Sequence, residues 1–162
     1  MLRIVKIVLA AAVAALGLLS GFFDFLGWSD TVAAVAKVTS MSSWEGGAQS
    51  WNCVNIPALN WLGAAWIAGL DLVYGALCAI GAARMWRSRN AGAIEFSAAK
   101  TLALAGCGLA AMMLFGGFIV VAETFFELWR SDVMRDAVLD SAYRYLGSVL
   151  LIALFIASKE SE

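Results

Sequence analysis

Four long apolar stretches constrain this chain more than any other feature of its sequence. They run over about residues 4–28, 59–86, 101–129 and 141–158. Each approaches or exceeds the roughly 20 apolar residues that an α-helix needs to cross the hydrocarbon core of a bilayer. Unpaired backbone groups are costly in lipid, and barrel strands would alternate polar with apolar residues. The sequence therefore predicts an all-α integral membrane protein, with four transmembrane helices in one up-down bundle spanning residues 1–162.

Composition supports this prediction and excludes several functions. With 62% hydrophobic and 14% charged residues, the 162-residue chain has more apolar surface than one soluble core could bury. Its formal charge of -1, with Lys and Arg spread along the chain, argues against nucleic acid as a partner. The sequence has no histidine, the usual ligand of haem and metals and the usual general base. We therefore expect no enzyme activity and no catalytic, metal-binding or cofactor-binding residues.

The three cysteines form no CxxC pair, and we interpret them as small apolar residues. They are Cys53, Cys78 and Cys107. The start of the chain, with basic residues before an Ala-rich apolar run, also resembles a secretory signal peptide with a cleavage site near residues 12–15. The apolar run continues without interruption to Phe23, which is long for a signal, so we favour a spanning helix.

The distribution of basic residues predicts the orientation of the bundle. With the N-terminus in the cytoplasm, seven Lys and Arg residues lie inside and four lie outside. The seven are Arg3, Lys6, Arg84, Arg87, Arg89, Lys100 and Lys159. The four are Lys37, Arg130, Arg135 and Arg144. Both termini are therefore expected in the cytoplasm.

The longest segment outside the apolar stretches is the outer loop of residues 29–58. Asp30 is expected to cap a short helix through about Met41, with apolar residues at helical spacing. We expect this helix to lie on the membrane surface. Pro57 has the fixed φ that suits the first position of the next helix.

The remainder of this loop contains two tryptophans among glycines, Trp44 and Trp51. Exposed aromatic side chains of this kind often carry the binding energy of protein interfaces. The loop is therefore a candidate contact surface for a partner. The alternative is that both indoles only anchor the protein at the level of the lipid headgroups.

Asp71 is the most distinctive ionisable residue in the spanning stretches. It lies 12 residues beyond Leu59, which places it near the midplane at about 18 Å of helical rise. A charged side chain there costs ~2.5 to 3.5 kcal/mol on insertion scales, so it usually faces the bundle interior, a partner or water. Asp71 is either a functional site, for a proton, an ion or another subunit, or a bonded residue that locks the bundle.

A second group of charges is expected at one depth in the outer half of the membrane. Glu123 and Glu127 are four residues apart and would share one face of the third helix. Asp24 and Arg144 would lie at the same level. Because like charges repel in lipid, we predict that one or two of the acids pair with Arg144 in a structural cluster. A docking site for a partner and a proton path are the alternatives.

Small residues indicate where helices pack closely. Gly17 and Gly21 form a GxxxG step on the first helix, which allows close approach of two backbones. The second helix has glycines every six residues, which spreads them over three faces and suggests neighbours beyond this chain. They are Gly63, Gly69, Gly75 and Gly81.

Several short motifs resemble a known family, over roughly residues 20–155. They are Val38-Thr39-Ser40-Met41-Ser42, the acidic residue in the second helix, Gly81-Ala82, Phe96-Ser97-Ala98-Ala99-Lys100, Phe125-Phe126 and Trp129-Arg130-Ser131. The chain is similar to the bacterial family called domain of unknown function 2165. It departs from that family at Ser42, where the pattern has aspartate, and at Thr124, where it has an acidic residue. The resemblance implies a small four-helix protein of the bacterial inner membrane with no established activity.

Two functions fit these features. We favour a non-catalytic accessory or scaffold subunit of a larger bacterial membrane complex, in contact with lipid and with other subunits or further copies of itself. The alternative is a small transporter or channel for protons, ions or solutes that uses Asp71 and the outer acids. The sequence shows no inverted repeat of the kind that many transporters contain.

Overall fold

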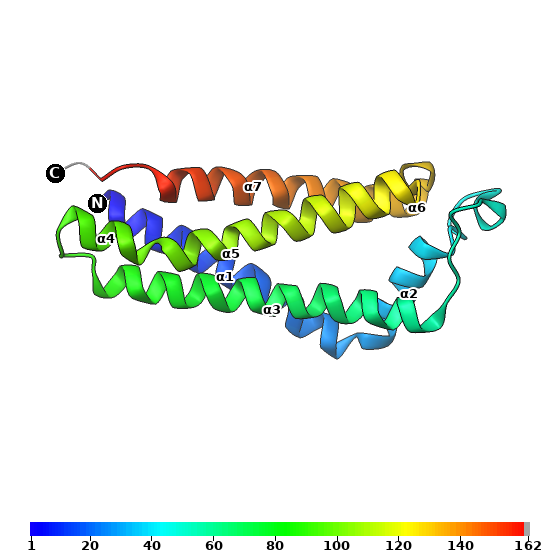
Figure 1. The fold of residues 1–162 in the computed structure, drawn as a ribbon, viewed down its shortest axis with the longest axis horizontal. Coiled ribbons are helices and arrows are strands. Elements are labelled where there is room, and N and C mark those ends of the chain that lie inside the picture. Colours follow the sequence, from blue (N-terminus) through cyan, green and yellow to red (C-terminus); the bar gives the residue numbers. More distant parts are fainter. Residues whose placement is uncertain (161–162) are drawn as a thin grey trace.

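The computed structural model describes residues 1–160 and confirms the predicted all-α architecture. The described part is helical without β-strands and contains four helices long and apolar enough to cross a membrane. These helices span Leu2–Leu26, Pro57–Arg87, Ala93–Phe125 and Asp132–Ala157. The first is α1 and the second is α3, while the third and fourth are each built from several shorter elements. Both ends of the chain lie at one end of the bundle (Figure 1).

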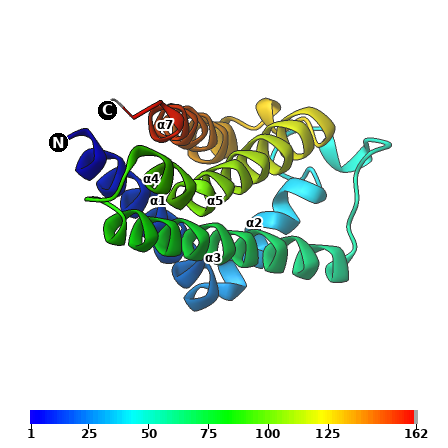
Figure 2. The ribbon, with the colours of Figure 1, turned by 60° about the vertical axis from the view of Figure 1, so that its left-hand side comes forward.

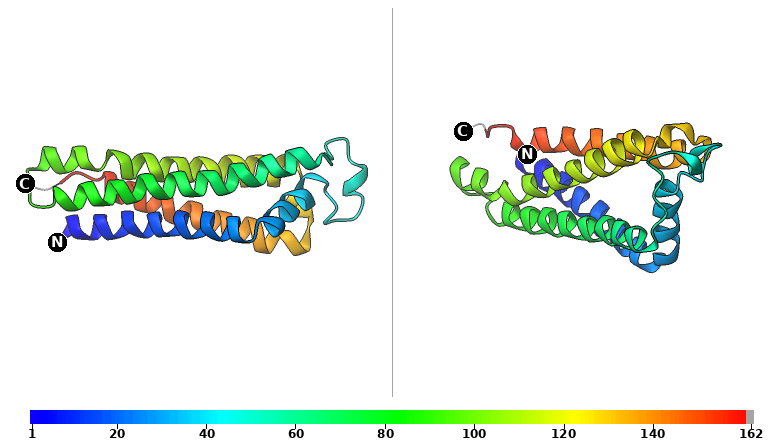
Figure 3. Two further views of the ribbon diagram at one scale, coloured as in Figure 1. Left: turned by 90° about the horizontal axis from the view of Figure 1, so that it is seen from below. Right: turned by 45° about the vertical axis from the view of Figure 1, so that its right-hand side comes forward.

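The four long helices form a ring around a common core (Figure 2). The contact between α1 and α3 is the most extensive. α3 also packs against α5, and α5 packs against α7. Contacts between α7 and α1 close the ring. Away from the termini, the pair of α1 and α3 diverges from the other two helices (Figure 3). The short helix α2, Trp28–Thr39, crosses this wider end. We call it the outer end, and the end with the termini the inner end.

The third long helix differs from the predicted stretch of residues 101–129. It starts earlier, with α4 at Ala93–Ala99, and continues as α5 at Thr101–Met112. From there Met113–Phe125 is a π-helix, in which hydrogen bonds join residues five apart. π-Helical turns are frequent at functional sites because they change the direction of side chains.

The fourth long helix is longer than the predicted residues 141–158. It comprises α6 (Asp132–Met134), a π-helical turn (Arg135–Leu139) and α7 (Asp140–Ala157). The fully buried Ser131 starts it, because its Oγ accepts a hydrogen bond of 3.2 Å from the backbone N–H of Met134. This is a typical N-cap contact.

The boundaries of the other helices partly follow the predictions. Pro57 occupies the first turn of α3, as predicted. The prediction for Asp30 was wrong: α2 begins at Trp28, so Asp30 lies in its first turn and caps nothing. There its negative charge still favours the helix N-terminus. The helix ends at Thr39, before Met41 adopts a left-handed backbone with a φ of 50°.

Small residues set the close packing of α3. An added Cβ on Gly17 would lie 2.6 Å from the carbonyl oxygen of Asp71, so the backbones of α1 and α3 are in direct contact. On α3 itself, the glycines meet different neighbours. Gly63 faces α2, Gly75 faces α1 and Gly81 faces α5, whereas Gly69 has open space. Three of these four glycines therefore pack against other helices of this chain.

Candidate functional site

A cavity of about 220 Å³ lies inside the bundle between its middle and the outer end. All four long helices line it. Its polar lining consists of Ser20, Asp24, Asp71, Tyr74 and Tyr145. The π-helix provides an apolar wall of Met113, Leu114 and Phe118. We call this cavity the chamber. It is large enough for several water molecules or a small ion.

Asp71 is the central polar group of the chamber. It is only 5% exposed, and among residues 1–160 no Lys or Arg forms a salt bridge with it. Its side chain lines the chamber together with those of Asp24 and Tyr74. Asp24 is positioned in turn by α2, because the Thr31 hydroxyl donates a hydrogen bond of 3.4 Å to its carboxylate. The structure therefore brings the two aspartates together.

Sequence reasoning missed the polar partners of the two aspartates. Ser20 lies four residues before Asp24 on α1, and Tyr74 lies three residues after Asp71 on α3. Residues three or four apart share a face of an α-helix, so this spacing was a usable signal. Tyr145 had no comparable signal, because its place depends on how α7 packs against the other helices.

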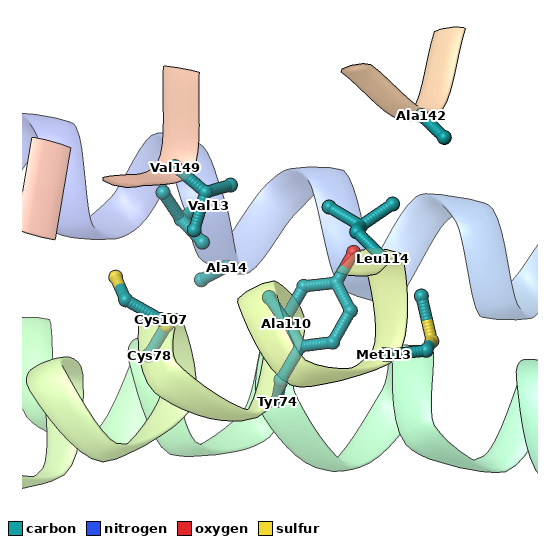
Figure 4. Packing of buried hydrophobic residues seen from close by; sticks show 10 residues of the cluster. All are labelled: Val13, Ala14, Tyr74, Cys78, Cys107, Ala110, Met113, Leu114, Ala142 and Val149. Carbon is teal, nitrogen blue, oxygen red and sulfur yellow. The ribbon is translucent and has the colours of Figure 1, made fainter. Parts of the chain in front are cut away.

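Apolar side chains close the inner side of the chamber. The buried residues below it form one cluster that includes Val13, Ala14, Cys107 and Val149, with the Tyr74 ring packed among them (Figure 4). A second apolar cluster fills the bundle from there to the inner end. The chamber is therefore a mainly apolar cavity with a few polar side chains, and it lies in the outer half of the bundle. Cys78 and Cys107 behave here as buried apolar residues.

The chemistry of the chamber follows from its two carboxyl groups. In a low-dielectric environment two adjacent carboxylates repel strongly unless a proton or a cation lies between them. Hydroxyl groups such as those of Ser20 and Tyr74 can donate to or accept from such a ligand. The arrangement is thus suited to hold and exchange a proton or a small cation.

The predicted cluster around Arg144 was wrong. The Arg144 side chain is exposed and donates instead to the Ser141 hydroxyl at 3.0 Å and to the carbonyl oxygen of Asp140 at 3.2 Å. Glu123 accepts a hydrogen bond of 2.5 Å from the Tyr143 hydroxyl. The Tyr143–Glu123 hydrogen bond links the third and fourth long helices without an ion pair.

The prediction that Glu123 and Glu127 share one helical face also failed. The π-helix ends at Phe125, and Glu127 lies beyond it with a left-handed φ of 51°. Its carboxylate forms an ion pair with Arg130, at 3.2 Å from the Nε atom. An interpretation based on α-helical spacing could not anticipate either feature.

The loops at the outer end form a second hollow, which we call the outer groove. It has a volume of about 540 Å³ and is lined by Ser43, Trp44, Glu45, Arg130, Asp132 and Val133. The Arg130 guanidinium lies over the Trp44 ring, 4.7 Å from its centroid. Two buried polar atoms of the lining, Ser43 Oγ and Trp44 Nε1, have no hydrogen-bond partner among the described residues.

Trp51 lies on the same outer loop and is 88% exposed. The loop beneath it is held in place, because the Asn52 amide donates a hydrogen bond to the carbonyl oxygen of Phe125. The Trp51 ring itself contacts the Phe125 ring edge-on, with centroids 6.0 Å apart. Ser131 also donates to the carbonyl oxygen of Ser43 at 3.3 Å. The loop therefore presents Trp51 from a fixed position.

Within residues 1–160 no three acidic or cysteine side chains lie together in a way that could hold a metal ion. The four membrane-length helices, with an apolar surface around a partly polar interior, define a small multi-pass integral membrane protein. The chain belongs to the family described as predicted small integral membrane protein (DUF2165), whose model matches residues 2–159. This confirms the family resemblance of the sequence. No curated protein and no solved structure matches the chain.

Proposed function

We propose that this protein is a small membrane carrier that binds a proton or a small cation in the chamber between Asp24 and Asp71. The observation that supports this proposal is the position of Asp71. It is buried in a membrane-spanning helix without a basic partner among the described residues, beside a cavity that could hold a ligand. A buried carboxyl group of this kind is costly in a membrane, which favours a functional reason for its presence.

The closed inner half of the bundle favours a carrier over an open channel. Apolar side chains fill the core from Cys78 to the inner end. A proton or cation in the chamber therefore reaches the inner end only after these helices separate. Carriers expose their binding site to one side at a time, and this conformation corresponds to a state closed on the inner side.

The first prediction concerns ion movement by Asp71→Asn. In liposomes that carry the wild-type protein, an imposed pH or cation gradient should decay faster than in protein-free liposomes. Asp71→Asn should remove this difference, because the amide cannot carry the negative charge that attracts the ligand. A dye inside the liposomes reports the gradient. The matched control is Glu95→Gln, which removes an exposed acid at the inner end. Wild-type liposomes without flux, or unchanged flux in Asp71→Asn, would rule out the carrier.

A second candidate function is that of an accessory or scaffold subunit of a larger bacterial membrane complex. The outer groove and Trp51 favour it. The groove is lined by Ser43 and Trp44, and the exposed indole of Trp51 is held on the same outer loop. Buried tryptophans are frequent energetic centres of interfaces.

The second prediction tests this subunit function with Trp51→Ala. In mild detergent, the wild-type protein should purify with a stoichiometric partner, either a larger protein or a second copy of the chain. Trp51→Ala should weaken this association by at least about 2 kcal/mol, the loss typical of an interfacial hot spot. Trp86→Ala, an exposed tryptophan at the inner end, is the matched control. A wild-type protein that is always monomeric, or equal recovery with Trp51→Ala, contradicts this function.

We further infer that the protein lies in the bacterial inner membrane with both termini in the cytoplasm. The excess of Lys and Arg at the inner end, seven against four, supports this orientation. The lack of histidine in the sequence supports a non-catalytic role. Fusion of a reporter to either terminus, active only in the cytoplasm, tests the orientation.

A further inference from the structure

Three basic side chains converge at the inner end of the bundle. Arg3 and Lys6 come from α1, and Lys100 comes from the junction between α4 and α5. Lys6 is only 1% exposed and Lys100 only 2%. The fully buried Phe96 ring lies beneath them, 4.9 Å from the Arg3 guanidinium and 5.5 Å from Lys100 Nζ. We call Arg3, Lys6 and Lys100 the basic site.

The segment after α7 places a carboxylate in the basic site. α7 ends at Ala157, and the chain continues in an extended conformation from Ser158. The Glu160 carboxylate lies 2.7 Å from Lys6 Nζ and 3.5 Å from Arg3 Nε, and it also pairs with Lys100. The Ser158 carbonyl oxygen accepts hydrogen bonds from Lys6 at 2.7 Å and from Lys100 at 3.0 Å.

Positive charges outnumber negative charges in the basic site. Across residues 1–160, Glu160 is the acid that forms ion pairs with these three cations. Burial alone would raise the pKa of Glu160, but the hydrogen bonds from Lys100 and Lys6 outweigh it and keep the pKa below its ordinary value of 4.5. Glu160 is therefore a carboxylate at neutral pH. Within residues 1–160, one carboxylate thus faces three basic side chains, two of which, Lys6 and Lys100, are buried. Such an excess of buried positive charge is unfavourable in a membrane protein.

We propose that the basic site binds a phosphate group and that Glu160 occupies the site in its place when phosphate is absent. Two lysines and an arginine already form ion pairs with one carboxylate. A phosphate group offers more acceptor oxygens and, as a monoester, up to two negative charges. It would therefore balance the site better than a single carboxylate does.

Two sources could supply this phosphate. The basic site lies at the end of the membrane-spanning helices, where the headgroups of acidic phospholipids are found, and basic pockets between helices bind such headgroups. A soluble phosphate compound from the adjacent aqueous phase presents the same chemistry. In both cases, phosphate binding displaces Glu160 and releases the segment after α7.

The test compares the wild-type protein with Glu160→Gln, which removes the competing charge from a segment outside the helices. In a maltoside detergent, native mass spectrometry measures retained phosphatidylglycerol, and titration calorimetry measures the binding of inorganic phosphate. We expect Glu160→Gln to bind one of these probes about tenfold more tightly, the effect of removing one charge-assisted competitor. Diacylglycerol with the same acyl chains is the phosphate-free control lipid. Glu95→Gln provides the same charge change at an exposed position of the inner end.

The outcomes separate the two sources and can overturn the proposal. A gain for phosphatidylglycerol alone identifies a lipid headgroup, and a gain for inorganic phosphate identifies a soluble ligand. Addition of Lys100→Gln to Glu160→Gln should cancel either gain. The proposal is wrong if Glu160→Gln binds neither phosphatidylglycerol nor inorganic phosphate more tightly than wild type and Glu95→Gln do. It is also wrong if diacylglycerol shows the same gain, or if the gain survives Lys100→Gln.

Discussion

Replacing Gly17 with leucine is expected to destabilise the bundle by about 3 kcal/mol or more, the upper range for overpacking a core. Even the first carbon of a new side chain would lie 2.6 Å from the carbonyl oxygen of Asp71 and closer still to the edge of the Tyr74 ring. A backbone oxygen cannot move aside as a side chain can, so α1 and α3 would have to separate. Thermal unfolding in detergent, followed by circular dichroism, should show a much lower midpoint or no folded protein.

The other glycines provide graded controls for this prediction. Gly108 has open space around it, so Gly108→Leu should leave the unfolding midpoint nearly unchanged. Gly21 is intermediate, because an added carbon there would first meet the flexible Leu72 side chain at 2.8 Å. The expected order of damage for leucine is therefore Gly17, then Gly21, then Gly108. Equal effects at Gly17 and Gly108 would contradict the close contact between α1 and α3.

Replacing Asp71 with leucine is expected to stabilise the protein and, if the proposed carrier function is correct, to abolish ion movement. Asp71 is almost completely buried and has no basic partner among residues 1–160. Replacement of buried charged groups by apolar residues of similar volume is often stabilising by about 1 to 4 kcal/mol. The chamber beside Asp71 leaves room for the leucine side chain. We therefore expect a higher unfolding midpoint for Asp71→Leu than for wild type.

This measurement decides between the two interpretations of Asp71. A functional residue is commonly retained at a cost in stability, so its removal stabilises the protein. If Asp71 instead locks the bundle through hydrogen bonds, Asp71→Leu should lower the unfolding midpoint. Asp71→Asn preserves shape and polarity and should lie between Asp71→Leu and wild type. A destabilised Asp71→Leu protein would argue for a structural role and against the proposed carrier.

The architecture could be predicted because bilayer thickness and hydrogen bonding leave few alternatives for long apolar stretches. Local sequence features also predicted the start of α3 at Pro57 and the close helix contact at Gly17, because proline fixes φ and glycine permits close approach. The change to π-helix at Met113 was not predictable. The apolar residues of this segment are equally compatible with an α-helix and a π-helix. Which of the two forms depends on packing against the other helices.

The candidate site was predictable only in part. The depth of Asp71 followed from counting residues along a helix. The association of Asp71 with Asp24 was not predicted, because we grouped Asp24 with the acids of the third helix. Whether Asp24 meets Asp71 depends on the tilt of α1 against α3, which the sequence does not specify. The basic site was missed because Lys6 and Lys100 were counted only as indicators of orientation. Their convergence with Glu160 joins three distant parts of the chain, which no local pattern reveals.

If the protein is the proposed carrier, the backbone contact between α1 and α3 determines which part of the molecule can rearrange during its transport cycle. At Gly17 and Gly75 the two helices touch without intervening side chains, so they cannot slide or tilt against each other without steric clashes. They form a rigid half that carries both aspartates. In the proposed carrier the mobile half is then α7 with the π-helix, because α7 packs against α1 far less extensively than α3 does, and the π-helix meets α3 through the Trp66 side chain at Gly117. Cross-linking α1 to α3 should therefore leave a transport cycle intact, whereas cross-linking α7 to α1 should arrest it.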